Sequence, residues 1–233
     1  MTNPMFSRRL VPTSATTNGY KEKTMFITRY RDMTRMNHWA VALLFICAGL
    51  TGLALFHPSM FFFSMFFGGG QWTRILHPFF GLLMVLGFVF LFFAVVRDNF
   101  WTKTDTAWVK KAPELLKGNE HAMPPVHKYN AGQKAVFWIF AVSLVLLLIT
   151  GFMFWQPWFA DFFPIPLRRF AMLVHAASAL ALVLSVIMHV YAAIWVKGSF
   201  RAMTRGTVHE DWAKSHHPLW YKEVAEDAKR NKR

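Results

Sequence analysis

The fold of this chain is decided by its last apolar run, FAMLVHAASALALVLSVIMHVYAAIWV at residues 170–196. The run contains no Lys, Arg, Asp or Glu. At ~1.5 Å per residue, a helix of this length extends about 40 Å, which is enough to cross a bilayer with some tilt. It carries two histidines, His175 and His189. Ionisable side chains inside a membrane span indicate a functional site.

The spacing of these two histidines suggests what the site holds. They are 14 residues apart, and at about 100° per residue the rotation between them is close to four full turns. Both imidazoles therefore lie on nearly the same helix face, roughly 21 Å apart along the axis. This arrangement predicts a helix that gives one axial ligand to each of two haems stacked across a membrane. The alternative is a pair of buried histidines held by hydrogen bonds.

The composition supports a membrane protein. Hydrophobic residues make up 55% of the 233-residue chain, with 25 Phe and 10 Trp, which is too apolar for an ordinary soluble domain. The formal net charge of +14 indicates basic cytoplasmic loops rather than nucleic-acid binding. The single cysteine, Cys47, cannot form a disulfide within the chain, a zinc site or an iron–sulphur cluster. No C-x-x-C-H motif attaches haem covalently, so the ten histidines are the available metal ligands.

The hydropathy pattern predicts an all-α integral membrane protein with four transmembrane helices forming a di-haem bundle. The predicted spans are residues 37–56, 75–96, 135–155 and 170–196. They belong to a membrane domain at 26–198, which lies between a flexible arm at 1–25 and a basic tail at 199–233. Pro78 is expected in the first turn of the second span, where proline is tolerated. Residues 58–72 are expected at the membrane interface and residues 97–134 in a long basic loop.

Charge asymmetry predicts the orientation. Of the 26 Lys and Arg residues, 23 lie in the N-terminal arm, the loop between the second and third spans, and the tail. Only Arg74, Arg168 and Arg169 lie in the other two connections. Because cytoplasmic segments carry the excess of Lys and Arg, both termini are predicted to be cytoplasmic.

An internal repeat relates the two halves of the chain. The segment LTGLALFHP at 50–58 resembles ITGFMFWQP at 149–157, and RILHPFFGLLMVLGF at 74–88 resembles MLVHAASALALVLSV at 172–186. The second match aligns His77 with His175, and such a parallel repeat implies an axis along the membrane normal. The alternative is chance similarity between apolar segments. The small residues Gly49, Thr51 and Gly52 leave a notch in the first span, which serves either close helix packing or the approach of a porphyrin face.

Depth sorts the four span histidines into two pairs. The repeat places His77 and His175 at equal depth toward the outside, where they predict the axial ligands of an outer haem. His38 and His189 lie toward the cytoplasmic side and predict the ligands of an inner haem. Two axial imidazoles leave iron without an open position, so such haems carry electrons rather than activate oxygen.

These residues identify a family. The matching segments are NHW at 37–39, RILHPFFG at 74–81, LLKGNEH at 115–121, KYNAGQK at 128–134, VHAA at 174–177, IMHVYAAIWVKGS at 187–199 and WAKSHHPLWYKE at 212–223. With them the chain resembles the cytochrome b (gamma) subunit of membrane-bound, quinone-linked formate dehydrogenase. The resemblance covers nearly everything after residue 25, and the N-terminal arm is longer than the family leads one to expect.

The resemblance implies the same two haem b sites and adds a quinone site beside the inner haem. Asn130 and Gln133 would line a site for menaquinone or ubiquinone, Gly132 would leave room for the ring, and His189 would also lie close. From the residues alone, the KYNAGQK segment also fits a helix N-terminus with solvated polar side chains.

The family further implies an electron relay in anaerobic respiration in the bacterial inner membrane. A periplasmic molybdenum- or tungsten-containing alpha subunit would oxidise formate, and an iron–sulphur beta subunit would pass electrons through both haems to quinone. Protons would be taken up from the cytoplasm, and the heterotrimer could assemble further. The chain would thus be the electron-transfer and quinone-reducing subunit of an oxidoreductase, with no residues for formate oxidation itself.

Two other functions fit part of the pattern. A cytochrome b of a hydrogenase or of a thiosulfate or polysulfide reductase would share the histidines, and a haem-free membrane anchor or small transporter would bury them for structure. Six further histidines are expected to be solvated or in contact with a partner subunit rather than metal-bound, with His121 or His127 as a candidate for proton delivery. These six are His57, His121, His127, His209, His216 and His217.

Overall fold

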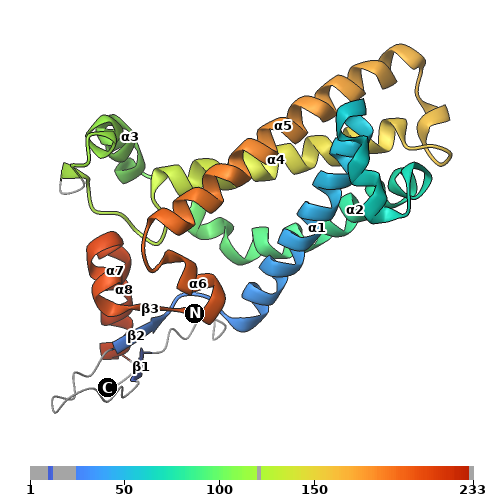
Figure 1. Ribbon diagram of the computed structural model, residues 1–233. Coiled ribbons are helices and arrows are strands. Elements are labelled where there is room, and N and C mark those ends of the chain that lie inside the picture. The colour runs from blue at the N-terminus through green and yellow to red at the C-terminus, as the bar shows by residue number, and fades with distance from the viewer. Residues whose placement is uncertain (1–9, 13–24, 120–121, 231–233) are drawn as a thin grey trace. The chain divides into compact units, whose positions relative to one another are not determined.

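Four long helices dominate the computed structural model, which describes residues 10–12, 25–119 and 122–230 (Figure 1). They are α1 (Asp32–Phe56), α2 (Gly70–Val95), α4 (Ala131–Phe154) and α5 (Ile165–Trp195). Within this part of the chain, these are the four helices long and apolar enough to cross a membrane. The predicted fold class, a helical membrane bundle with four spans, is confirmed, whereas the side on which the termini lie stays a prediction.

The long helices begin four or five residues before the predicted spans, because helical hydrogen bonding continues into polar residues that hydropathy does not mark. One expectation is therefore wrong. Pro78 lies in the interior of α2 and not in its first turn, since the helix already begins at Gly70. The segment before it is the 3-10 helix η2 (Pro58–Phe67), which is too short to span a membrane. Gly68 and Gly69, both at positive φ, turn the chain from η2 into α2.

The connection between the second and third spans is more ordered than the expected loop. It contains η3 (Val96–Asn99) and the amphipathic helix α3 (Lys103–Leu116). Asp105 accepts hydrogen bonds from the backbone N–H of Thr102 at 2.7 Å and from its hydroxyl at 2.6 Å. These bonds satisfy groups at the start of α3, where a carboxylate is also favoured by the helix dipole.

The tail is folded as well. It forms α6 (Ser199–Arg205), β3 (Thr207–His209), α7 (Glu210–His216) and α8 (Pro218–Arg230). Strand β3 pairs with β2 (Met25–Thr28), which pairs with β1 (Leu10–Pro12), so the antiparallel sheet has the order β1-β2-β3. The sheet and tail helices bury one apolar cluster, which consists of Ile27, Ala202, Val208, Ala213, Trp220 and Val224. Neither the sheet nor this cluster was predicted, because its members are distant in sequence.

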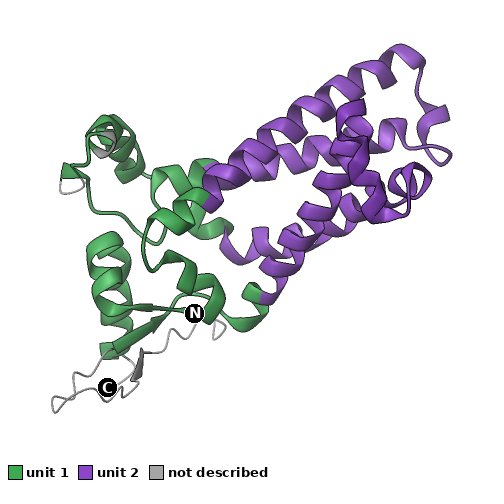
Figure 2. Cartoon of the chain, in the orientation of Figure 1, with its two compact units in different colours: residues 1–35, 96–135, 191–233 green, residues 36–95, 136–190 purple. Residues whose placement is uncertain are grey.

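The described residues divide into two compact units (Figure 2). Unit 1 draws on residues 1–35, 96–135 and 191–233, and unit 2 on residues 36–95 and 136–190. The predicted boundaries at 25 and 198 stay predictions. Unit 2 holds most of the four long helices and all four histidines of the predicted haem sites.

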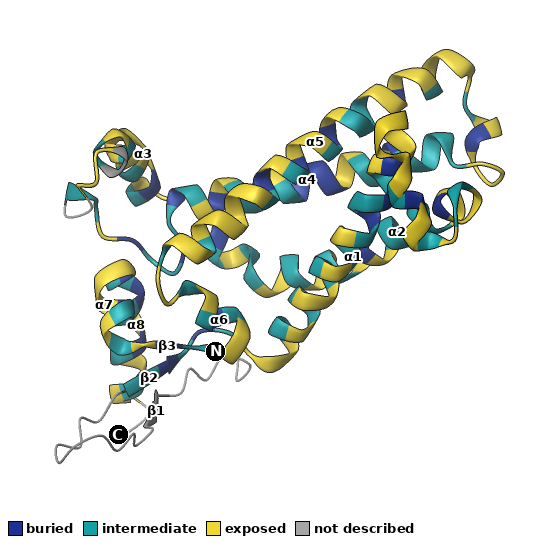
Figure 3. Cartoon of the chain, viewed as in Figure 1, coloured by how far each residue is buried: buried dark blue, intermediate teal, exposed yellow. Residues whose placement is uncertain are grey.

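The core of unit 2 takes one buried residue from each long helix, namely Ala48, Met84, Leu144 and Leu182. Large apolar side chains also point away from this core. Phe90 and Phe93 on α2 are each 72% exposed, and the exposed faces of the helices are visible in Figure 3. Such extensive exposed apolar surface is typical of helices that face lipid. The four helices are therefore those of a multi-pass membrane protein.

Candidate functional site: two histidine pairs

The first pair consists of His77 on α2 and His175 on α5. Their ring centres are 6.3 Å apart and their planes are inclined by 66°. Both side chains are half-buried inside unit 2. The structure thus brings together the two histidines that the repeat aligned.

A threonine from the preceding long helix contacts each of these rings. The Nδ1 atom of His77 lies 2.9 Å from the Oγ1 atom of Thr51, and the Nδ1 atom of His175 lies 2.9 Å from the Oγ1 atom of Thr150. The next residue is a glycine in both cases. A Cβ atom on Gly52 would lie 3.1 Å from the Cε1 atom of His77, and the corresponding distance from position 151 to His175 is 3.5 Å.

This contact occurs twice, as the predicted repeat requires. The two threonines are 99 residues apart and the two histidines 98 residues apart, which are the offsets of the aligned segments. Thr51 and Gly52 of the notch therefore contact the imidazole of His77, whereas a Cβ atom on Gly49 would meet nothing within 4 Å. The approach of a porphyrin face to the notch stays a prediction.

The second pair consists of His38 on α1 and His189 on α5, with ring centres again 6.3 Å apart and planes inclined by 48°. The ring of Trp39 lies 5.2 Å from that of His38, and the ring of Phe140 lies 5.8 Å from that of His189. The Nδ1 atom of His38 is buried and has no hydrogen-bond partner among the described residues. The structure thus brings together the two histidines that were paired by their predicted depth, and their role as ligands of one haem stays a prediction.

The geometry of both pairs fits a haem iron between two imidazoles. A metal–imidazole bond is about 2 Å long in zinc sites, so two rings that share a metal have centres roughly 6 Å apart once the radius of each ring is included. Among the described residues, no group of three or more His, Cys, Asp or Glu side chains could hold a metal ion. The histidines thus occur as pairs, which suits a haem better than a zinc site. The Nδ1 atom of His38 is buried without a hydrogen-bond partner among the described residues, so that atom does not hold the ring in place.

The residues expected at a quinone site begin helix α4, in unit 1. Asn130 precedes the helix, and its side-chain oxygen accepts the backbone N–H of Gln133 at 2.9 Å. The side-chain oxygen of Gln133 accepts the backbone N–H of Asn130 at 3.0 Å. These two bonds form a capping box. A Cβ atom on Gly132 would lie 3.4 Å from the Oδ1 atom of Asn130 and 3.5 Å from the ring of Trp108.

Comparison with known proteins agrees with this geometry. Residues 29–206 match the family described as prokaryotic cytochrome b561. The chain belongs to this family. The nitrate-inducible formate dehydrogenase cytochrome b556(Fdn) subunit of Escherichia coli K12 is 41% identical over 202 residues, which cover 87% of this chain and 93% of that protein. The cytochrome b556(fdo) subunit of formate dehydrogenase from the same strain is 42% identical over 198 residues, covering 85% and 93%.

A third relative is also a cytochrome b556 subunit of formate dehydrogenase. The formate dehydrogenase cytochrome b556 subunit of Haemophilus influenzae is 42% identical over 197 residues, which cover 84% of this chain and 83% of that protein. The expected resemblance to this group is therefore confirmed. Membership of the prokaryotic cytochrome b561 family implies haem b, and the two histidine pairs are the places in this family member that fit it.

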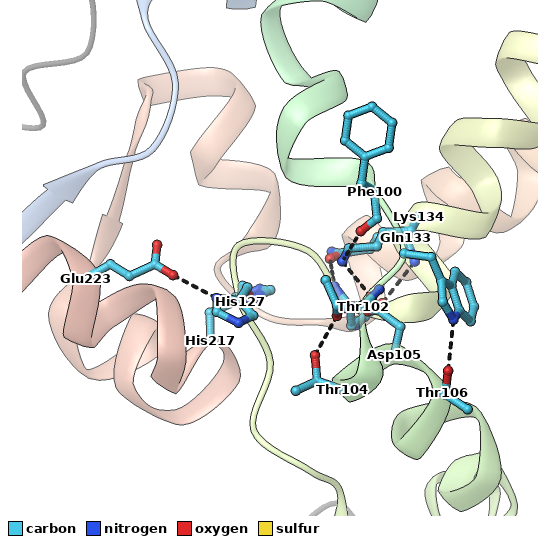
Figure 4. Close-up of polar contacts among 12 residues, drawn as sticks. Phe100, Thr102, Thr104, Asp105, Thr106, His127, Gln133, Lys134, His217 and Glu223 are labelled. Atoms are coloured by element: carbon cyan, nitrogen blue, oxygen red, sulfur yellow. Dashed lines mark hydrogen bonds and ion pairs between the residues drawn. The ribbon is translucent and has the colours of Figure 1, made fainter. Parts of the chain in front are cut away.

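Beside the capping box, this cytochrome b561 family member holds a buried ion pair. The Nζ atom of Lys134 lies 2.7 Å from a carboxylate oxygen of Asp105, and each side chain is only 2% exposed (Figure 4). Lys134 also donates to the carbonyl of Phe100 at 3.0 Å. Burial alone would raise the pKa of the Asp105 carboxyl, but hydrogen bonds from Lys134 and Thr102 outweigh it and hold that pKa below its ordinary value.

One expectation for the other histidines of this cytochrome is wrong. His217 is 3% exposed, so it is neither solvated nor available to a partner subunit. Its Nδ1 atom lies 2.7 Å from the carbonyl of His127, and its Nε2 atom lies 3.4 Å from the guanidinium of Arg29. Burial and the charge of Arg29 lower the pKa of His217 to about 3, so the ring is neutral. The sequence did not reveal this because Arg29 and His127, which contact the ring, lie 188 and 90 residues away along the chain.

The remaining histidines have local roles where they are described. His57 accepts the backbone N–H of Ser59, His127 lies 2.7 Å from Glu223, and His121 lies outside the described residues. The ring of His209 lies 4.4 Å from that of Phe26, and the ring of His216 lies 5.0 Å from that of Trp212. None of these contacts resembles the two pairs within the long helices.

Sequence reasoning missed two features of the site. Thr150 was not singled out, although its alignment with Thr51 in the repeat was a usable signal. The ion pair of Lys134 with Asp105 carried no such signal, since 29 residues separate the two side chains and both segments are otherwise polar.

Proposed function

We propose that this chain is the membrane cytochrome b subunit of a formate dehydrogenase and relays electrons from an iron–sulphur subunit to quinone. The observation that carries the proposal is the geometry of the two histidine pairs, each with ring centres 6.3 Å apart. The three relatives described above, at 41–42% identity over most of the chain, are named as such subunits. The family to which the chain belongs supports haem b as the cofactor.

Four residues would hold two haems in this proposal. His77 and His175 would be the axial ligands of the outer haem, and His38 and His189 those of the inner haem. Bound in this way, haem supplies one-electron transfer with no open coordination position. The chain's own helices α1, α2 and α5 position the rings.

The capping box leaves two amide NH₂ groups free to donate hydrogen bonds to a quinone. Both side-chain oxygens of Asn130 and Gln133 are used by the helix cap, and the two side-chain NH₂ groups make no hydrogen bond within the described residues. Quinone carbonyls accept hydrogen bonds, and an amide NH₂ donates them. We propose that these NH₂ groups bind menaquinone or ubiquinone near the cytoplasmic end of α4, with protons taken up from that side.

Substitutions that retain the cap test this role. Asn130→Asp and Gln133→Glu keep the oxygen acceptors of a capping box but remove the NH₂ donors. We expect quinone reduction to fall while both haems stay reducible by the upstream donor and the protein stays as stable. Loss of a haem or of folding in these variants would assign the two residues to the scaffold instead.

Formate oxidation would take place on a partner. A single cysteine cannot hold an iron–sulphur cluster, and two axial imidazoles suit electron transfer only. An iron–sulphur subunit and a molybdenum- or tungsten-containing subunit would therefore complete the complex in the bacterial inner membrane. Co-purification with identification of the partners tests this directly, because partners of a hydrogenase or sulphur-compound reductase would contradict it.

A spectrum tests the haem assignment. The reduced-minus-oxidised absorption spectrum of the purified complex should show b-type bands that titrate as two components. His77→Ala and His175→Ala should each remove the same component, and His38→Ala and His189→Ala the other. His57→Ala, at a histidine outside both pairs, is the matched control and should remove neither. Retention of both components after replacement of all four histidines would overturn the proposal.

A further inference from the structure

The two threonines that contact His77 and His175 are buried, and each donates its hydroxyl proton to a backbone carbonyl of its own helix. Thr51 is 0% exposed and Thr150 is 6% exposed, so water does not reach either hydroxyl. The Oγ1 atom of Thr51 lies 2.7 Å from the carbonyl oxygen of Cys47, and that of Thr150 lies 2.6 Å from the carbonyl oxygen of Leu146. Two oxygens at such distances repel each other unless a proton lies between them.

This arrangement determines which way the second hydrogen bond runs. A hydroxyl has one proton, and a carbonyl oxygen can only accept. Because each threonine donates to its helix carbonyl, it must accept at its contact with the histidine. The proton of that contact therefore belongs to Nδ1 of His77 and of His175, at 2.9 Å in both cases. A neutral imidazole with its proton on Nδ1 presents a free electron pair on Nε2.

We propose that Thr51 and Thr150 are positioning residues that hold the two outer haem ligands in the tautomer that binds iron through Nε2. The inference rests on the proposed function, since it assumes that His77 and His175 are axial ligands. A hydrogen bond from the distal nitrogen fixes the orientation of a ligating imidazole and raises the basicity of its ligating nitrogen. A more basic ligand stabilises ferric over ferrous iron and lowers the midpoint potential of that haem.

Within the described part of the chain, no comparable hydrogen bond links a hydroxyl group to the rings of the inner pair. The Nδ1 atom of His38 has no hydrogen-bond partner among the described residues, and none of the hydrogen bonds described in the structure involves the ring of His189. The two haems would thus be tuned differently by residues of this chain. The threonine contacts favour a lower potential at the outer site, which is the direction needed for electrons to pass from the outer haem to the inner one.

The test is a redox titration of the b-type absorption bands in the intact complex, with each threonine replaced in turn. In Thr51→Val and Thr150→Val, the midpoint potential of one haem should rise, so that its ratio of oxidised to reduced form at a fixed potential falls severalfold. A tenfold change corresponds to 59 mV for a one-electron couple. Both variants should affect the same haem, although the two positions are 99 residues apart, and the double variant should shift it further.

Two controls separate this effect from a general loss of packing. Thr51→Ser and Thr150→Ser keep the hydroxyl and should restore the potential. Thr73→Val removes another fully buried hydroxyl, one turn before His77, which donates to the carbonyl of Gly69 and contacts no imidazole. It should leave both potentials unchanged. If the valine variants lose the outer haem, rescue by serine with the inner haem intact supports the same role.

The failure of this inference can be told apart from the failure of the proposed function. Fewer than two b-type components in the unaltered complex, or no loss of a component in His77→Ala and His175→Ala, would reject the haem assignment itself. Two components that respond to the histidine variants, but with no shift, shifts of both haems, or serine variants that behave like valine, would overturn the role of the threonines alone.

Discussion

At the scale of single residues, Gly52 is the glycine that approaches a predicted haem ligand most closely within the described residues. A Cβ atom there would lie 3.1 Å from the Cε1 atom of His77, which is closer than ordinary van der Waals contact. Three residues earlier on the same helix, a Cβ atom on Gly49 would meet nothing within 4 Å. A side chain at position 52 would therefore crowd His77, whereas a side chain at position 49 would crowd nothing.

We expect Gly52→Ala to displace the ring of His77 and reduce the content or shift the spectrum of one b haem. Gly49→Ala should leave both haems unchanged and stabilise α1 by up to about 1 kcal/mol, because alanine is the better helix former. Haem content by absorption and thermal stability of the purified complex measure the two effects. Equal behaviour of the two variants would show that contact with the ring does not matter.

A second prediction at this scale concerns His217, whose pKa is about 3 in the folded chain. The ordinary value in an unfolded chain is about 6.5, so between these two values the unfolded state binds a proton that the folded state does not. The contribution of His217 to stability is therefore complete above pH 6.5 and declines as the pH falls toward 3. The decline approaches about 1.4 kcal/mol for each pH unit in that window.

His217→Gln should flatten this acid dependence, because glutamine can donate to the carbonyl of His127 and accept from Arg29 without titrating. The measurement is the thermal unfolding midpoint of the purified protein at several pH values between 7 and 4. His216→Gln, at the exposed neighbour, is the matched control and should keep the dependence of the unaltered chain. An identical slope in both variants would argue against a buried neutral His217.

At the scale of elements, one ion pair joins α3 to the first turn of α4. A lysine at a helix N-terminus is disfavoured by the helix dipole, so Lys134 depends on Asp105 and on the carbonyl of Phe100 (Figure 4). Removing one partner of a buried pair leaves an uncompensated charge. The pair therefore fixes the position of the capping box that Asn130 and Gln133 form at the same helix end.

Lys134→Met should destabilise the chain by about 3–5 kcal/mol, because Asp105 stays buried without its partner. Lys117→Met, which breaks an exposed pair with Glu114, should cost no more than about 1 kcal/mol. Chemical denaturation of the detergent-purified protein compares the two. The double variant Lys134→Met with Asp105→Leu should recover part of the loss, and equal effects of the two lysine variants would contradict a buried charge.

At the scale of the whole molecule, the distribution of basic residues predicts that both termini face the cytoplasm. Because Cys47 is the single cysteine, a Cys47→Ser chain offers a background for labelling with a membrane-impermeant maleimide. Trp158→Cys should react from the periplasm in intact cells with a permeable outer membrane. Lys110→Cys and Glu226→Cys, at exposed positions, should react only after the inner membrane is opened. The reverse pattern would invert the topology.

Much of the membrane part could be predicted from the sequence because its signals are local. Apolar runs identified the four long helices, and the spacing of His175 and His189 within one run placed them on one face. The repeat aligned His77 with His175, which the structure brings together. The fold of the polar part could not be predicted in the same way. Ile27 pairs with Val208 across 181 residues, and no local pattern in the sequence predicts such a strand pairing.

The sequence by itself determined the four spans and the two histidine pairs, because hydropathy, helical period and an internal repeat are properties of the chain before it folds. Only the tertiary structure decided which acceptor each imidazole meets, that His217 is buried against Arg29, and that Asn130 and Gln133 cap a helix while keeping their NH₂ groups available. These contacts depend on where packing places residues that are distant in sequence. A buried polar atom cannot form a hydrogen bond with water, so its partner within the fold determines whether it donates or accepts a proton.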